Sequence, residues 1–150
     1  MFYLPAKDWS PRFEDSFFTC SLTSRAVLQA PPDGNDDENI IHQHHPAVYF
    51  NIVVKCVHKE KICPRRYSQF RKLYDELRWN PPQSQSPLGA EAQPLRIPPK
   101  TCLFSKIDDE FLDIRQEELS EFLDELLKRP NYPTHPAVRE FLGLDEIASR

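Results

Sequence analysis

Hydrophobic and polar positions along the chain predict three strands followed by three helices. The stretches Phe17–Leu28 and Val48–Val57 are rich in β-branched and aromatic residues, and the second is the strongest strand signal. A tight charged turn over residues 58–61 leads from there into a short third strand at Ile62 and Cys63. Because adjacent strands joined in this way form a hairpin, the three stretches predict a small antiparallel sheet.

Beyond the third strand, the apolar positions change to helical spacing. The first helix is predicted from Tyr67 to Trp79, where the Asn-Pro-Pro sequence that follows ends it. The second begins at Asp108, a favourable N-cap, and ends at the Lys-Arg-Pro sequence of residues 128–130. A short third helix runs from Pro136 to Gly143. The apolar stripe of the second helix consists of Phe111, Leu112, Leu119, Phe122, Leu123, Leu126 and Leu127.

These elements predict one α+β domain, a three-stranded antiparallel β-sheet packed against a helical subdomain. Residues 81–99 contain six prolines and are expected to form an extended, partly polyproline-like loop between the first two main helices. We expect residues 1–16 to form an N-terminal arm because they show no periodicity. The domain is then expected to span residues 17–145, and residues 146–150 to form a C-terminal tail.

Several functional classes are not expected from the composition. No apolar run approaches the roughly 18–20 residues of a membrane span, so any membrane contact should be peripheral. The first residues do not have the pattern of an export signal, and the four cysteines include no CxxC pair, which together favour reduced thiols in the cytosol. The chain has no GxSxG sequence and no phosphate-cradling glycine loop, so we expect neither catalysis nor a cofactor.

Two loops suggest other kinds of partner. His42, His44 and His45 lie in the polar loop of residues 30–46, but no carboxylate or cysteine pair stands at ligand spacing, so no metal is expected. The Pro-rich loop of residues 81–99 is an alternative binding segment for an aromatic groove on another protein, although it lacks the basic flanks that make such binding specific. No nucleic-acid partner is expected.

Charge is strongly segregated within a nearly neutral chain. Residues 1–50 carry a net charge of −4, residues 51–106 carry +7, and residues 107–150 carry −7. The basic middle is where an anionic partner is expected to bind. Internal pairing of this middle segment with the acidic C-terminal segment is the competing interpretation, although exposed ion pairs contribute little to stability.

Three cationic residues from separate places suit an anionic ligand. Arg66 lies beside Tyr67 at the strand-to-helix junction, and its planar fork fits a phosphate. Lys100 ends the stiff sequence Ile-Pro-Pro-Lys, where its ammonium could meet a second phosphate. Arg115 falls on the apolar stripe of the second helix, so it must extend to solvent or face a polar site at the edge of the core. Ordinary surface ion pairs, and a core role for Tyr67, are the alternatives.

The sequence resembles the phox-homology (PX) domain, a phosphoinositide-binding module of the sorting-nexin and phox type. The resemblance covers about residues 17–145 and depends on four motifs that occur in the family's order. They are Arg65-Arg66-Tyr67-Ser68-Gln69-Phe70, Pro98-Pro99-Lys100, FLDIRQEEL around Arg115, and YPTHPAVREFLGL before the C-terminus.

The resemblance implies a role for each site residue. Arg66 would bind the 3-phosphate of phosphatidylinositol 3-phosphate, and Tyr67 would pack under the inositol ring. Lys100 would meet the 1-phosphate, and Arg115 would bond the 4- and 5-hydroxyls. Alternation along the strand points Arg65 to the opposite face from Arg66, so Arg65 is expected outside the pocket.

The family also inserts apolar side chains of the following loop into the bilayer. Cys102, Leu103 and Phe104 occupy that position here, and Leu103 and Phe104 either insert or pack under the loop. The long acidic loop that contains residues 36–38 departs from the family and would oppose binding to an anionic surface.

The resulting prediction is a membrane-targeting module that is recruited peripherally from the cytoplasm to endosomal membranes by phosphatidylinositol 3-phosphate. A species with an added 4-phosphate is not distinguished by the sequence. Two alternatives stay open: a protein-interaction scaffold with a weak or vestigial lipid pocket, and the targeting domain of a larger trafficking protein or lipid-regulated enzyme.

Overall fold

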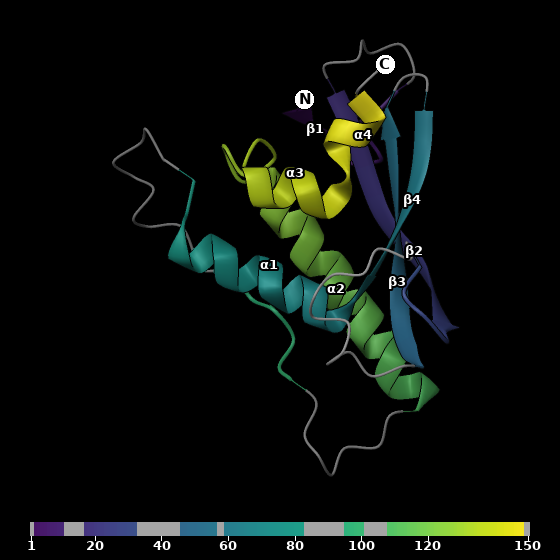
Figure 1. The fold of residues 1–150 in the computed structure, drawn as a ribbon. Helices are drawn as coiled ribbons and strands as arrows, with labels where there is room; N and C mark the ends of the chain where they lie inside the picture. Colours follow the sequence, from purple (N-terminus) through teal and green to yellow (C-terminus); the bar gives the residue numbers. More distant parts are fainter. Residues whose placement is uncertain are drawn as a thin grey trace.

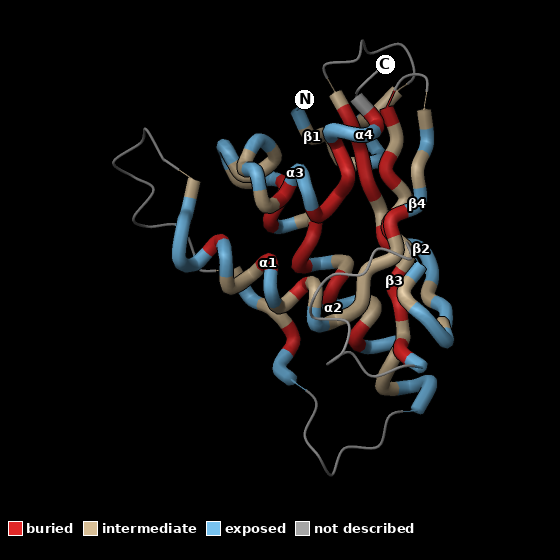
Figure 2. Tube along the Cα trace, in the orientation of Figure 1, coloured by how far each residue is buried: buried red, intermediate tan, exposed pale blue. Residues whose placement is uncertain are grey.

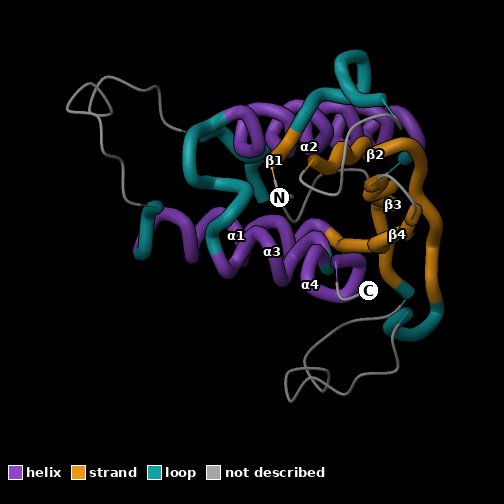
Figure 3. Tube along the Cα trace, turned by 90° about the horizontal axis from the view of Figure 1, so that it is seen from above, coloured by secondary structure: helices purple, strands orange, loops and turns teal. Residues whose placement is uncertain are grey.

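Four strands precede four helices in the computed structural model, which describes residues 2–10, 17–32, 46–56, 59–82, 95–100 and 108–148. The helices gather on one side of the sheet (Figure 1). Viewed from above, α2 runs along one side of the helical layer, and α1, α3 and α4 lie along the other (Figure 3). The elements are β1 (Phe2–Tyr3), β2 (Phe17–Leu28), β3 (Ala47–Cys56), β4 (Lys59–Arg66), α1 (Tyr67–Trp79), α2 (Asp109–Lys128), α3 (Pro136–Leu142) and α4 (Leu144–Ala148).

The sheet has four strands in the order β1-β2-β3-β4 and is mixed. The antiparallel pairs β2–β3 and β3–β4 were predicted, but the three-stranded count was wrong because β1 pairs with β2 in parallel. Two aromatic contacts accompany this pairing, a tilted one between Phe2 and Phe17 with centroids 5.9 Å apart and an edge-on one between Tyr3 and Phe18 at 5.7 Å. A strand of two residues is too short to show a period-2 pattern, so the sequence contains no local signal for it.

The third strand begins earlier than predicted. Lys59 pairs with Cys56 and Glu60 with Lys55, so most of the expected charged turn belongs to β4. The Lys55 and Glu60 side chains form a cross-strand ion pair of 3.7 Å, which favours the extended conformation of these polar residues. The charged residues at the start of β4 have the composition of a turn, and for this reason they were predicted as a turn and not as a strand.

The three predicted helices are confirmed. The side chain of Asp108 accepts a hydrogen bond of 2.9 Å from the Phe111 amide and so caps α2. Pro136 occupies the first turn of α3, and His135 Nδ1 accepts from the Ala137 amide at 3.1 Å. Gly143 ends α3 with φ of 65°, a left-handed conformation that favours glycine.

The structure adds the short helix α4 after Gly143. Ile147 of this helix is buried in the core, and its carbonyl accepts a 2.8 Å hydrogen bond from Lys59 Nζ. Contacts of this kind lie on both sides of the predicted tail boundary at residue 146. The domain limits at residues 17 and 145 stay predictions.

One core lies between the sheet and the helices (Figure 2). Phe70 of α1 is fully buried at its centre, where its ring contacts Phe141 of α3 at a centroid distance of 5.0 Å, Phe122 of α2 at 6.4 Å and Phe50 of β3 at 6.5 Å. Edge-on aromatic contacts of this kind add to the burial of apolar area. They hold the start of α1 against both α2 and α3. The Cys20 and Cys56 side chains are buried thiols in this core.

Candidate functional site

The paired arginines occupy the last positions of β4, directly before α1. Arg65 is opposite Phe50 of β3, and Arg66 is opposite Tyr49. The guanidinium of Arg66 lies over the Tyr49 ring, 6.0 Å from its centroid, and the Arg66 amide donates a 2.9 Å hydrogen bond to Gln69 Oε1. This bond fixes the entry into α1.

Arg65 contacts a different part of the molecule. Its Nε donates a 2.9 Å hydrogen bond to the Phe141 carbonyl near the end of α3, and its guanidinium lies 5.7 Å from the Phe141 ring centroid. Its Nη1 also donates to the Pro64 carbonyl at 2.9 Å. The two adjacent side chains therefore have separate partners, Phe141 for Arg65 and Tyr49 for Arg66.

Arg115 of α2 is buried, with only 7% of its surface exposed. Its guanidinium contacts two aromatic rings, 4.1 Å from the Tyr67 centroid and 4.8 Å from the Phe111 centroid. Its Nη2 donates a 2.6 Å hydrogen bond to the Pro99 carbonyl. Burial lowers the pKa of Arg115, while the neighbouring Tyr67 and Glu118 act in the opposite direction. The guanidinium thus faces backbone at the edge of the core.

Tyr67, the first residue of α1, binds the residue next to Pro99, the partner of Arg115. Its hydroxyl donates a hydrogen bond to the Pro98 carbonyl, and its ring is half-buried against the core. Tyr67 and Arg115 therefore hold two consecutive carbonyls of the extended segment that ends at Lys100. In this way α1, α2 and residues 95–100 meet at one place.

The predicted site residues are brought together unequally. The side chains of Tyr67 and Arg115 are in direct contact. Arg66 directly precedes Tyr67 in the chain, but its guanidinium lies over the Tyr49 ring. Lys100 is exposed and directly follows the two bonded prolines. The arrangement offers a flat ring beside cationic groups at the start of a helix, which suits a hydroxylated, phosphorylated ligand.

One acidic residue near this site, Asp113, forms an ion pair with another part of the molecule. The Asp113 carboxylate forms a 2.8 Å ion pair with Arg25 of β2, whose guanidinium also donates to Gln116 Oε1 at 3.0 Å. Asp113 lies two residues before Arg115 in the chain, where an unpaired carboxylate would weaken the positive potential. The ion pair with Arg25 offsets that charge.

Other predicted residues lie outside the part of the chain that the structure describes. The membrane-insertion residues Cys102, Leu103 and Phe104 are in this group, as are His42, His44 and His45 and the acidic residues 36–38. Their roles stay predictions.

Three residues that contribute to the site were not singled out from the sequence. Tyr49 was included in a strand pattern that is typical of core residues, and only the pairing of β3 with β4 shows that it contacts Arg66. Phe111 was assigned to the apolar stripe, although its position four residues before Arg115 was a usable signal. Gln69 is the third.

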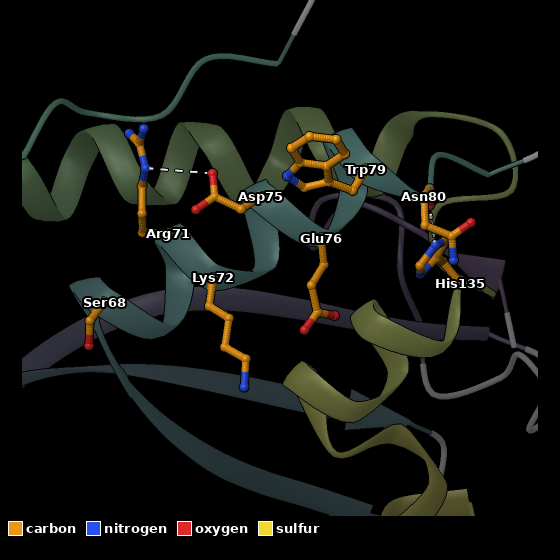
Figure 4. A pocket seen from close by; sticks show the side chains of 8 residues that line it. All are labelled: Ser68, Arg71, Lys72, Asp75, Glu76, Trp79, Asn80 and His135. Atoms are coloured by element: carbon orange, nitrogen blue, oxygen red, sulfur yellow. Dashed lines mark hydrogen bonds and ion pairs between the residues drawn. The ribbon is translucent and has the colours of Figure 1, made fainter. Parts of the chain in front are cut away.

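A separate groove of about 570 Å³ lies on the outward side of α1 (Figure 4). Arg71 and Asp75 form an ion pair of 3.8 Å on one flank, and Lys72 and Glu76 lie on the other flank. Trp79, 89% exposed, lies at the end of the helix. The charges are mixed, so this groove is less suited to an anion than the site at the start of α1. The lining residues are Ser68, Arg71, Lys72, Asp75, Glu76, Trp79, Asn80 and His135.

Within the residues that the structure describes, no helix has the length and apolar character needed to cross a bilayer. In those same segments, no group of three or more His, Cys, Asp or Glu side chains is arranged to hold a metal ion.

Comparison with known sequences gives a family match and longer relatives. Residues 54–145 match the family described as the PX domain. The chain is 32% identical over 126 residues to the serine/threonine-protein kinase Sgk3 of Rattus norvegicus, an overlap of 84% of this chain and 23% of the kinase. It is 33% identical over 99 residues to sorting nexin-16 of Mus musculus, an overlap of 66% of this chain and 26% of that protein. The chain therefore spans about a quarter of the length of these relatives.

Solved structures show the same fold. A designed CISK-PX domain aligns with a TM-score of 0.54 at 19% identity, covering 81% of this chain and 95% of that one. The mouse SNX19 PX domain with bound sulphate aligns with a TM-score of 0.54 at 20% identity, covering 83% and 94%. At this level of identity the likeness concerns the fold alone.

Proposed function

Because this chain belongs to the PX domain family, whose members are typically phosphoinositide-binding modules, we propose that it binds phosphatidylinositol 3-phosphate on endosomal membranes. The family match confirms the resemblance that the four sequence motifs indicated. The observation that carries the proposal is the convergence of Tyr67 and Arg115 on the Pro98 and Pro99 carbonyls, directly beside Arg66. These contacts join the start of α1, the helix α2 and the segment that ends at Lys100, and they support a shared site for the three cations.

Arg66 is proposed to bind the 3-phosphate. It occupies the N-cap position of α1, and the first turn of that helix contains no acidic residue. The amides of a helix N-terminus and its dipole favour an anion, and a guanidinium can bind a phosphate through two parallel hydrogen bonds. Both contributions support the same ligand at the same end of α1.

The other three residues are proposed to bind the rest of the headgroup. Arg115 uses Nη2 on the Pro99 carbonyl, and a guanidinium has further N–H groups for the 4- and 5-hydroxyls. The Tyr67 ring would pack under the inositol, and its contact with the Arg115 guanidinium keeps it in place. Lys100 is exposed at the end of the held segment, where an ammonium can reach the 1-phosphate.

Membrane attachment is proposed to combine this pocket with two further contributions. Cys102, Leu103 and Phe104 would insert apolar side chains into the bilayer. Lys72 is exposed on α1, and a basic residue of this kind contributes about 1 kcal/mol near an anionic surface. Such weak contributions act together and prolong residence on the membrane.

The test is sedimentation with liposomes that contain phosphatidylinositol 3-phosphate. Arg66→Gln is expected to abolish lipid-dependent sedimentation and to leave the fold intact, because the phosphate loses its bidentate partner. Arg78→Gln is the matched control, since it removes the same charge from the exposed far end of the same helix and should sediment like the wild type. Undiminished sedimentation of Arg66→Gln would refute the proposal. A panel of all phosphoinositides tests the preference for the 3-phosphate alone.

We further propose that the module directs a larger trafficking protein or lipid-regulated enzyme to membranes. The matched relatives support this, because both are longer proteins and one is named as a kinase. The length of the natural transcript tests the idea. A transcript that encodes no further domain would contradict it.

A further inference from the structure

The segment that carries Lys100 is held by the side chains of two other site residues. Leu95 and Ile97 pack against the core at the start of the segment, and the next two residues are prolines. Prolines have no N–H group, so this part of the backbone can be held only through its carbonyls or its rings. The Pro98 carbonyl accepts from the Tyr67 hydroxyl, and the Pro99 carbonyl accepts from Arg115 Nη2 at 2.6 Å.

The two donors are themselves immobilised. The Arg115 guanidinium lies between the rings of Tyr67 and Phe111, with centroid distances of 4.1 and 4.8 Å. Tyr67 begins α1 and Phe111 lies in the first turns of α2, so the stack joins the two helices. A buried guanidinium with two aromatic contacts has little freedom left, and its hydrogen bond is directed at one carbonyl. The stack therefore fixes the backbone directly before Lys100.

We propose that Tyr67 and Arg115 are positioning residues for Lys100, in addition to any contact that they make with the ligand. This inference deepens the proposed function and depends on it. Lys100 is exposed, and a lysine side chain has many rotamers, so the placement of its backbone decides how often the ammonium reaches the second phosphate. Preference for a ligand with two phosphates is thus set by hydrogen bonds that need not touch the ligand.

Tyr67→Phe separates the two roles of the tyrosine. The variant keeps the ring that would pack under the inositol and loses the hydroxyl that binds the Pro98 carbonyl. Tyr74→Phe is the matched control, because Tyr74 is a half-buried tyrosine of the same helix whose ring packs on Phe122 with a centroid distance of 6.3 Å. It lies two turns further along α1.

Calorimetric titration compares inositol 1,3-bisphosphate with inositol 3-phosphate, which differ only in the 1-phosphate. Tyr67→Phe is expected to weaken binding of the bisphosphate about fivefold more than binding of the monophosphate, the usual effect of one lost hydrogen bond. Lys100→Ala should remove the preference for the bisphosphate, and adding Tyr67→Phe to it should then change the two affinities by the same factor. Tyr74→Phe should behave like the wild type.

A second measurement needs no ligand. The ¹⁵N order parameter of the Lys100 amide is expected to fall in Tyr67→Phe from the rigid range near about 0.85 toward the flexible range below about 0.6. An unchanged order parameter, or an equal loss of affinity for both inositol phosphates, would overturn the positioning role. If the wild type binds neither compound, the proposed lipid function is refuted, and the order parameter still decides whether the tyrosine hydroxyl holds the segment.

Discussion

Two groups of basic side chains carry the same charge but contact different parts of the molecule. The first group, Lys59, Lys61 and Arg65 of β4, faces the C-terminal helices. Lys59 donates to the Ile147 carbonyl, Lys61 pairs with Glu146, and Arg65 donates to the Phe141 carbonyl. These cations hold α3 and α4 against the edge strand of the sheet.

The second group is Arg66, which directly precedes α1, Arg115, which contacts Tyr67 at the start of α1, and Lys100, which follows the Pro99 carbonyl that Arg115 binds. Arg66 lies over the Tyr49 ring, Arg115 lies between two aromatic rings, and Lys100 is exposed. Among their contacts in the described residues, the hydrogen bond to the Pro99 carbonyl joins Arg115 to a neutral partner. These contacts with aromatic rings and a neutral carbonyl differ from the ion pair that Lys61 forms with Glu146, because no carboxylate takes part in them.

The comparison explains why a basic segment does not by itself indicate a binding site. The two kinds of contact lie in different places: Lys61 pairs with Glu146 of the C-terminal segment, and Arg66 lies over the Tyr49 ring in the region that is proposed to bind an anion. The adjacent residues Arg65 and Arg66 lie on opposite sides of this division. Their separation follows from strand alternation, which sends consecutive side chains to opposite faces.

The largest effect on stability is expected from Arg65→Met. Methionine keeps the apolar stem of the side chain but leaves the Phe141 carbonyl without its charged donor, at a cost of about 2 kcal/mol. Urea unfolding should show the loss, and lipid binding of the folded protein should be unchanged. Lost lipid binding with normal stability would place Arg65 in the pocket and break the comparison.

A smaller loss, about 1–2 kcal/mol, is expected from Gly143→Ala, because alanine is strained at a φ of 65°. A Cβ atom there would also stand 2.8 Å from Lys61 Nζ and displace it from Glu146. Gly143→Asn is the informative control, since asparagine tolerates this backbone conformation but has the same Cβ. Stability close to wild type in the asparagine variant would assign the loss to backbone strain, and an equal loss in both would assign it to the contact.

The smallest effect is expected from Lys61→Gln, which removes an exposed ion pair. The hydrogen bond and charge of Lys61 lower the pKa of Glu146. A lowered pKa in the folded state stabilises the protein above the ordinary carboxyl range and loses that contribution as the pH falls. The difference in melting temperature between wild type and variant should therefore shrink below about pH 4. A difference that stays constant through this range would show that the ion pair is not its source.

The fold could be predicted from the sequence wherever the signal is local. Periodicity and capping residues such as Asp108, Pro136 and Gly143 located the three main helices. The strand β1 was missed because a two-residue strand has no period, and the start of β4 was predicted as a turn because Lys59 and Glu60 have turn-like polarity. Pairing with a distant strand decided both cases.

The candidate site was predictable only in part, for a related reason. Arg115 on an apolar stripe was a local anomaly that pointed to a polar partner. The partner itself, the Pro99 carbonyl, is a backbone group on another segment, and no residue pattern indicates which carbonyl a buried guanidinium will meet. The hydroxyl bond of Tyr67 to Pro98 was hidden for the same reason.

The central claim is that two adjacent arginines have opposite functions. It is tested most directly by titrating wild type, Arg65→Met and Arg66→Met with a soluble phosphatidylinositol 3-phosphate, together with urea unfolding of each protein. We expect Arg66→Met to lose binding with unchanged stability, and Arg65→Met to lose stability with unchanged affinity. Equal loss of binding in both variants, with both folded, would contradict the account.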